Sequence, residues 1–124
     1  MTEVSWGELI DKYTILAIKA ERLNDAAKVQ NVRTEMEALA PARDKAYTIA
    51  DISSLEAELK TVNETLWVIE DDIRDCERAK DFGPKFVELA RAVYHRNDER
   101  AAFKRQINER LGSRLMEEKS YKAY

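Results

Sequence analysis

The 124-residue sequence contains few of the residues that interrupt helices and few of those that carry common chemistry. It has three glycines, two prolines, one cysteine and one histidine. With 36% charged residues, this composition favours long helices whose outer faces are solvated. A single cysteine excludes an intrachain disulfide, and Cys76 is in phase with neighbouring Leu and Ile residues, so we interpret it as a small core residue.

The chain also lacks an apolar run long enough to cross a membrane. Its longest uncharged apolar-rich stretch, residues 13–18, is far shorter than the roughly 20 residues that a spanning helix needs. Residues 1–5 do not have the basic and then apolar pattern of a leader, so we expect a cytoplasmic protein without a membrane partner. The net charge of −3 argues against a nucleic-acid partner, because binding to phosphates needs a clustered excess of Lys and Arg.

No motif in the sequence identifies a reaction. There is no glycine-rich phosphate loop, no set of paired metal ligands and no nucleophile beside His95. Asp71, Asp72 and Asp75 have a helical spacing found in magnesium sites, but they fall away from the predicted apolar seam and no second acidic pair accompanies them. We therefore interpret these carboxylates as a solvated face, and we predict no metal and no cofactor.

The strongest pattern that the sequence does contain is an apolar stripe between residues 52 and 76. Its members recur at alternating three- and four-residue steps, the heptad signature of a helix packed lengthwise against another, as in a coiled coil. Gly83-Pro84 then forces a turn before a second long helix, so we predict an antiparallel helix hairpin over about residues 51–80 and 84–111. The stripe consists of Ile52, Leu55, Leu59, Val62, Leu66, Ile69, Ile73 and Cys76.

The N-terminal part predicts one or two further helices. Ser5 and Glu8 have the spacing of a capping box, so the first helix should begin at about Trp6. A second helix over about residues 26–39 would end before Pro41, although one continuous helix over residues 6–40 is an open alternative. The predicted core-facing stripe of the first helix is Leu9, Tyr13, Leu16, Ala20 and Leu23.

The segment that follows Pro41 has no clean period, so residues 41–50 are predicted to be a connection from which Tyr47 and Ile49 reach the core. Together these elements predict a single all-α domain over residues 1–124. In this domain the long hairpin packs against the N-terminal helix or helices, and residues 113–124 form a partly packed tail.

Three polar residues interrupt the apolar seam of the second hairpin helix, namely Asn97, Arg100 and Lys104. Their side chains can extend to water, bind an anion such as phosphate, or form a buried network that fixes the register of the helices. If buried, Arg100 needs a bound anion or an acidic partner, for which Glu70 is the preferred candidate and Glu8 a further one. The candidate ligand-binding residues are Lys12, Asn63, Glu70, Asn97, Arg100 and Lys104.

Two further features concern contacts with other molecules. Trp67 lies beside the seam, where it forms the rim of the core or, within a polar cradle, a stacking surface for a sugar or a base. Val4, Ile15 and Ile18 fall on the side of the first helix opposite its predicted core stripe. A small bundle covers one face of that helix, so this strip predicts the interface of a homo-oligomer, with a two-fold dimer favoured.

Several segments along nearly the whole chain resemble a small family of uncharacterised all-helical bacterial and phage proteins. They are residues 7–12 (GELIDK), 62–67 (VNETLW), 69–74 (IEDDIR) and 117–121 (EEKSY). The resemblance implies a domain of unknown function, with members in marine phages and among bacterial genes of surface-polysaccharide metabolism. It implies no catalytic residue.

The sequence leaves two classes of function. We expect a non-catalytic helical oligomerisation or adaptor protein, because a heptad seam without a catalytic constellation needs nothing more. The alternative is a protein that binds or processes an anionic small molecule, such as a nucleotide or nucleotide-sugar, at the basic polar cluster between helices. A deep cleft lined by that cluster would favour the second class, and closure of the same residues by salt bridges would favour the first.

Overall fold

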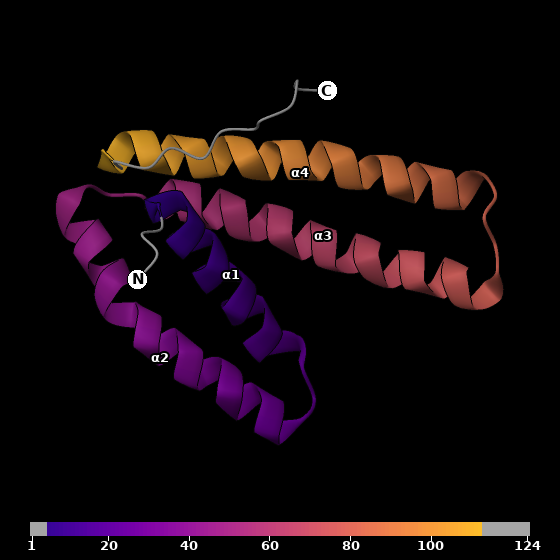
Figure 1. The fold of residues 1–124 in the computed structure, drawn as a ribbon, viewed down its shortest axis with the longest axis horizontal. Coiled ribbons are helices and arrows are strands. Elements are labelled where there is room, and N and C mark those ends of the chain that lie inside the picture. The colour runs from indigo at the N-terminus through magenta and orange to yellow at the C-terminus, as the bar shows by residue number, and fades with distance from the viewer. Residues whose placement is uncertain (1–4, 113–124) are drawn as a thin grey trace.

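The computed structural model describes residues 5–112, and within them the regular structure is entirely helical. Helices α3 and α4 form a long antiparallel hairpin, α1 packs across one end of it, and α2 returns alongside α1 (Figure 1). This arrangement confirms the predicted all-α class and the hairpin. Val4 and the predicted tail lie outside the described residues. The helices are α1 (Trp6–Arg22), α2 (Ala26–Ile49), α3 (Ser53–Ala79) and α4 (Pro84–Leu111).

Capping signals mark several helix ends. The Ser5 hydroxyl accepts a hydrogen bond from the backbone N–H of Glu8 at 3.2 Å, as the capping box predicts. The Asp25 carboxylate accepts one from the N–H of Ala27 at 2.9 Å and begins α2, so the first two helices are separate. At the end of α3 the left-handed residue is Lys80, with φ of 55°, whereas Gly83 in the turn has φ of −79°.

The end of α2 differs from its prediction. The helix continues through Pro41 to Ile49, so the predicted stop before Pro41 and the connection at residues 41–50 are wrong. A proline inside a helix removes the hydrogen bond to the carbonyl of the residue four positions earlier. That residue is Glu37, which is exposed, so water can reach the carbonyl.

Contacts on the far side of the proline hold this last part of α2 as a helix. Ala46 is completely buried in the main core cluster, and Tyr47 packs against that cluster as predicted. Ile49, which was also predicted to reach the core, is 49% exposed. The packing of Ala46 and Tyr47 against the core therefore outweighs the tendency of Pro41 to end the helix.

Helix α1 is central, because it packs against each of the other three helices. The prediction assumed that one face of α1 was covered and took Ile18 to lie on the outer side, to which Asp11 would also belong. Both are buried, with Ile18 only 1% exposed, so the premise that Ile18 lies on a free surface is wrong. A helix with neighbours on three sides buries most of its circumference. The prediction that only one stripe of α1 faces the core therefore fails. The buried residues of α1 are Gly7, Leu9, Ile10, Asp11, Thr14, Leu16 and Ile18.

The hairpin has two unlike parts. At one end α1 packs on it and α2 packs on α1, and we call this region, residues 5–69 and 97–112, the body. The other end, residues 70–96, is here called the arm, and most of it extends beyond α1 as two helices alone (Figure 1). The main core cluster lies wholly in the body and consists of Ile10, Ala46, Ile52, Leu59, Ile107 and Leu111.

Candidate functional site

The polar residues that interrupt the seam of α4 meet α1. Arg100 donates from Nε to Oδ1 of Asp11 at 2.9 Å and from Nη2 to Oδ2 at 2.5 Å, which is a bidentate pair. Asp11 is 2% exposed, so its charge needs this partner. Arg100 therefore has an acidic partner, as predicted, but the choice of Glu70 for that role is wrong.

Asn63 of α3 joins the same buried group. Its Nδ2 donates to Oδ1 of Asp11 at 3.0 Å and to Oγ1 of Thr14 at 2.9 Å, while the Thr14 hydroxyl donates to the backbone carbonyl of Asp11 at 2.7 Å. Because a carboxylate only accepts hydrogen bonds, the contact with Asp11 fixes which end of the amide faces α1. We call Asp11, Thr14, Asn63 and Arg100 the Asp11 network; it joins three helices at one point.

A second ion pair lies towards the start of α1. The Lys104 ammonium is 3.1 Å from the Glu8 carboxylate, and the N–H of Gly7 donates to Oδ1 of Asn108 at 2.7 Å. Helices α1 and α4 approach so closely here that a Cβ on Gly7 would lie 2.4 Å from the backbone oxygen of Lys104. Lys104 thus belongs to a helix contact that requires glycine at position 7.

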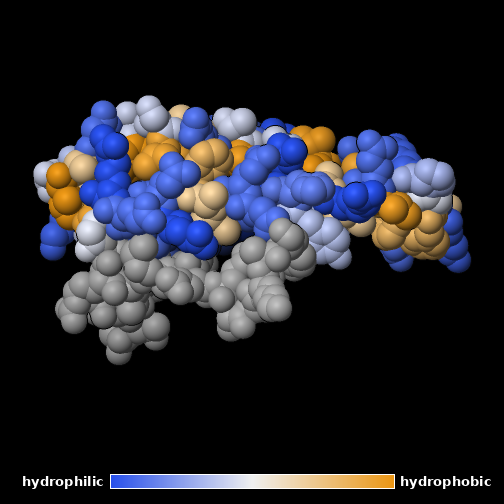
Figure 2. Space-filling model, turned by 90° about the horizontal axis from the view of Figure 1, so that it is seen from above, coloured by the Kyte–Doolittle hydropathy of each residue, from blue (hydrophilic) through white to orange (hydrophobic). Residues whose placement is uncertain are grey.

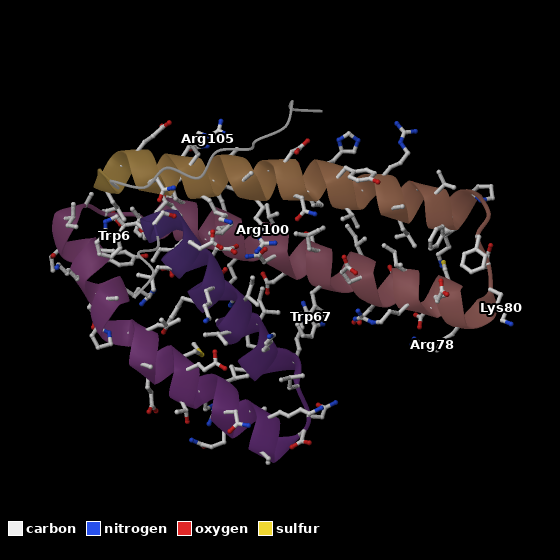
Figure 3. All side chains as sticks on the ribbon, viewed as in Figure 1. Trp6, Trp67, Arg78, Lys80, Arg100 and Arg105 are labelled. Carbon is white, nitrogen blue, oxygen red and sulfur yellow. The ribbon has the colours of Figure 1, made fainter. Side chains whose placement is uncertain are left out.

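Beside the Asp11 network a cleft of about 460 Å³ lies between α1, α3 and α4. Four of the six predicted ligand-binding residues line it, whereas Lys12 is exposed elsewhere and Lys104 lies outside the lining. Figure 3 shows Arg100 and Trp67 on the part of the hairpin that α1 covers. We call this space the Trp67 cleft, and its lining is Ile15, Ile18, Asn63, Leu66, Trp67, Glu70, Arg74, Asn97 and Arg100.

The charges around the Trp67 cleft are largely matched. Arg100 is paired with Asp11, and Arg74 is paired with Asp71 one helical turn before it. Glu70 adds a further negative charge to the lining. The predicted basic cluster is therefore not a concentration of positive charge, which weakens the prediction of an anionic ligand.

A second polar cluster, absent from the sequence analysis, ties α2 to the rest of the body. Arg43 donates to both carboxylate oxygens of Glu56, at 2.8 and 2.6 Å, and the Tyr47 hydroxyl donates to Glu56 at 2.5 Å. The guanidinium carbon of Arg43 lies 4.6 Å from the ring centre of Tyr13 and 5.1 Å from that of Tyr47. The helical i, i+4 spacing of Arg43 and Tyr47 could have indicated the cluster had this segment been predicted as helix.

This cluster perturbs two titratable groups. Burial, followed by the hydrogen bond to Glu56, raises the pKa of Tyr47 to about 12. The hydrogen bond to Glu56 raises the pKa of Arg43 above its ordinary value, so the guanidinium stays charged. The arrangement locks helices together and resembles no common catalytic constellation, because the Glu56 carboxylate is already bound by Arg43 and Tyr47.

Other candidates from the sequence lie apart from these clusters. His95 is exposed on the arm, as are Asp71 and Asp75, while Asp72 is partly exposed. Among residues 5–112, no three His, Cys, Asp or Glu side chains come close enough to hold a metal ion. The described helices also include none that is long and apolar enough to cross a membrane.

Comparison with known proteins gives a family but no described activity. No curated protein and no solved structure matches this chain. One family model matches it over residues 1–124 and agrees with the resemblance seen in the sequence. The chain belongs to this family, DUF6165, a family of unknown function.

Proposed function

We propose that the protein is a non-catalytic assembly protein that pairs with a second copy of itself through the arm. One observation carries the proposal: among the 27 residues 70–96, only Cys76 is buried. The arm nevertheless continues the apolar seam of the hairpin. Its partly buried apolar residues are Ile73, Phe86, Leu89, Ala90, Ala92 and Val93.

Apolar side chains also lie on the outside of the arm. Phe82 and Val87 are 52% and 51% exposed, and Figure 2 shows orange atoms at the end of the molecule that the arm forms. A hollow of about 620 Å³ runs along residues 83–96 of α4 and its N-terminal turn, with Val87 and Ala92 in its lining. Two helices alone leave such surfaces in water, whereas a four-helix bundle covers them.

The charge of the arm favours a second copy as the occupant. Residues 70–79 of α3 contain five acidic and two basic side chains, while residues 84–96 of α4 contain three basic and one acidic. A two-fold axis would place the acidic helix of each copy on the basic helix of the other. Both halves of the interface are then complementary, and Arg91 and Arg96 beside the α4 hollow would face acidic residues.

This proposal keeps the predicted homo-oligomer but assigns its interface to the arm in place of α1. Ile18 is buried and Ile15 lines the Trp67 cleft, so α1 offers less free apolar surface than the arm. The pairing of Arg100 and Lys104 with acidic residues supports the non-catalytic class over a phosphate-processing one. A cytoplasmic location and a link to surface-polysaccharide metabolism remain predictions.

The test is the mass in solution, measured by light scattering after size exclusion. The wild type should have twice the 14.4 kDa mass of one chain. Phe82→Glu/Val87→Glu should be a folded monomer, because both positions are exposed in the single chain and the charges would enter the interface.

Ile49→Glu is the matched control, because Ile49 is a similarly exposed apolar residue on the body. It should remain a dimer. A monomeric wild type, or a dimer that survives the arm substitutions, would contradict the proposal.

A further inference from the structure

We propose that the Trp67 cleft binds an uncharged heteroaromatic ring that carries an amino group, as the base of a nucleoside does. The cleft lies mostly in the body and includes Glu70 and Arg74 from the start of the arm, and the proposal does not rest on assembly through the arm. It rests on the volume and apolar lining of the cleft, on its matched charges and on the hydrogen-bond acceptors among its lining residues.

The size and the apolar lining of the cleft suit a flat ring. Its volume of about 460 Å³ falls in the range of roughly 300–1,000 Å³ that ligand pockets occupy. Ile15, Ile18 and Leu66 supply aliphatic surface, and Trp67 supplies an indole on which an aromatic ring can stack. Stacking on an aromatic side chain is a common way to hold a base.

The charge of the lining selects against a phosphate. Arg100 has both a nitrogen at Nε and one at Nη2 committed to Asp11, and Arg74 is paired with Asp71. A phosphate would have to compete with these carboxylates and would also approach Glu70. An uncharged ring avoids both costs.

Three side chains in the cleft lining, Asn63, Glu70 and Asn97, can accept a hydrogen bond from a ligand. Both amide hydrogens of Asn63 are directed to Asp11 and Thr14, so the planar geometry of the amide turns its Oδ1 away from these two partners. Asn63 is 6% exposed and lines the cleft, and its Oδ1 is the part of the amide that can accept a hydrogen bond from a ligand. The Glu70 carboxylate only accepts, and Asn97 can present its carbonyl. An exocyclic amino group on the ring can donate hydrogen bonds to these acceptors.

Isothermal titration of the wild type with four probes tests the proposal. Adenosine should bind, and purine riboside, which lacks the amino group, should bind about tenfold more weakly because an acceptor loses its donor. Adenosine monophosphate should bind within about threefold of adenosine, since the cations near the cleft are already paired. Glucose should not bind, because it supplies donors but no flat ring.

Each probe can overturn part of the claim. If adenosine does not bind, or if purine riboside binds equally well, the cleft does not recognise a ring that carries an amino group. Adenosine monophosphate binding tenfold or more tightly than adenosine would show a phosphate site. Glucose binding as tightly as adenosine would show that stacking is not required.

Substitutions test whether adenosine binds in the Trp67 cleft. Trp67→Leu and Asn97→Ala should each weaken adenosine binding about tenfold, and Asn97 is exposed, so its replacement should leave the melting temperature unchanged. Trp6→Phe is the matched tryptophan control and should retain binding, and in that variant the emission of Trp67 alone should change on titration. Unchanged affinity in both Trp67→Leu and Asn97→Ala, or no change in Trp67 emission, would overturn the assignment to this cleft.

Discussion

The body and the arm are built from the same two helices, yet they differ in what covers them. In the body Leu59 and Ile107 are completely buried, because α1 fills the groove of the hairpin. In the arm the same seam continues without a third helix, and Leu89 and Val93 remain partly exposed. A heptad seam therefore specifies the pairing of two helices, while burial depends on what packs across them.

Their ion pairs differ in the same way. The body is closed by the pair of Arg100 with Asp11, whose carboxylate is almost fully buried. The arm carries pairs between neighbouring turns of α3, Arg74 with Asp71 and Arg78 with Asp75, in which both side chains are more than half exposed. Exposed pairs of this kind contribute less than about 1 kcal/mol each, so the arm gains little stability from them.

Breaking the buried pair should have the largest effect. Arg100→Met leaves the Asp11 carboxylate buried with its guanidinium partner gone, which should lower the free energy of unfolding by about 3–5 kcal/mol. The double variant Arg100→Met/Asp11→Leu should recover part of that loss. Urea denaturation measures both, and a single variant as stable as the wild type would show that water already satisfies Asp11.

Two leucines on the same hairpin compare the regions directly. Leu59→Ala should cost about 2–5 kcal/mol, because it opens a cavity at a position that is 0% exposed. Leu89→Ala in the partly exposed arm should cost less than half as much when measured in dilute, monomeric protein. Equal losses at the two positions would mean that the arm is as well packed as the body.

The cluster at the end of α2 should make part of the stability of the body depend on pH. The pKa of Tyr47 is raised from 10.0 to about 12, so its contribution is fully present below pH 10 and is lost as the pH rises through 12. Tyr47→Phe should therefore lose less stability between pH 10 and 12 than the wild type does. Parallel losses in the two proteins would assign the alkaline transition to another group.

The smallest effect is expected at the tip of the arm. Lys80 has a left-handed backbone conformation, which costs a side chain with a Cβ roughly 1 kcal/mol. Lys80→Gly should therefore stabilise the protein by about 0.5 kcal/mol, after the higher entropy of unfolded glycine is subtracted. A thermal melt detects this gain, and a loss of stability would show that the lysine side chain makes a contact that outweighs the strain.

The parts of the fold that follow from local periodicity were predictable from the sequence. The stripe from Ile52 to Cys76 specified α3 and its pairing, and the capping box of Ser5 and Glu8 marked where α1 begins. The orientation of α1 was not predictable, because Asp11 is a charged residue that tertiary contacts bury. Its partner, Arg100, is 89 positions away.

Pro41 and the residues around the Trp67 cleft also show that local sequence signals do not reveal contacts between distant segments. A proline is a local signal to end a helix, yet the burial of Ala46 and the contacts of Arg43 and Tyr47 with distant Glu56 override it. At the site, seam positions correctly brought Asn63, Asn97 and Arg100 together. Which charges pair with one another could not be deduced from spacing, because the answer depends on the rotation of α1.

Amide hydrogen exchange at two protein concentrations tests the central claim, that the arm is completed by a second copy while the body is complete in one chain. Amides of residues 70–96 should exchange rapidly in dilute protein and become protected at high concentration, because dimerisation buries them. Amides in the body segments of α3 and α4 should be protected equally at both concentrations. Protection of the arm that does not change with concentration would contradict the account.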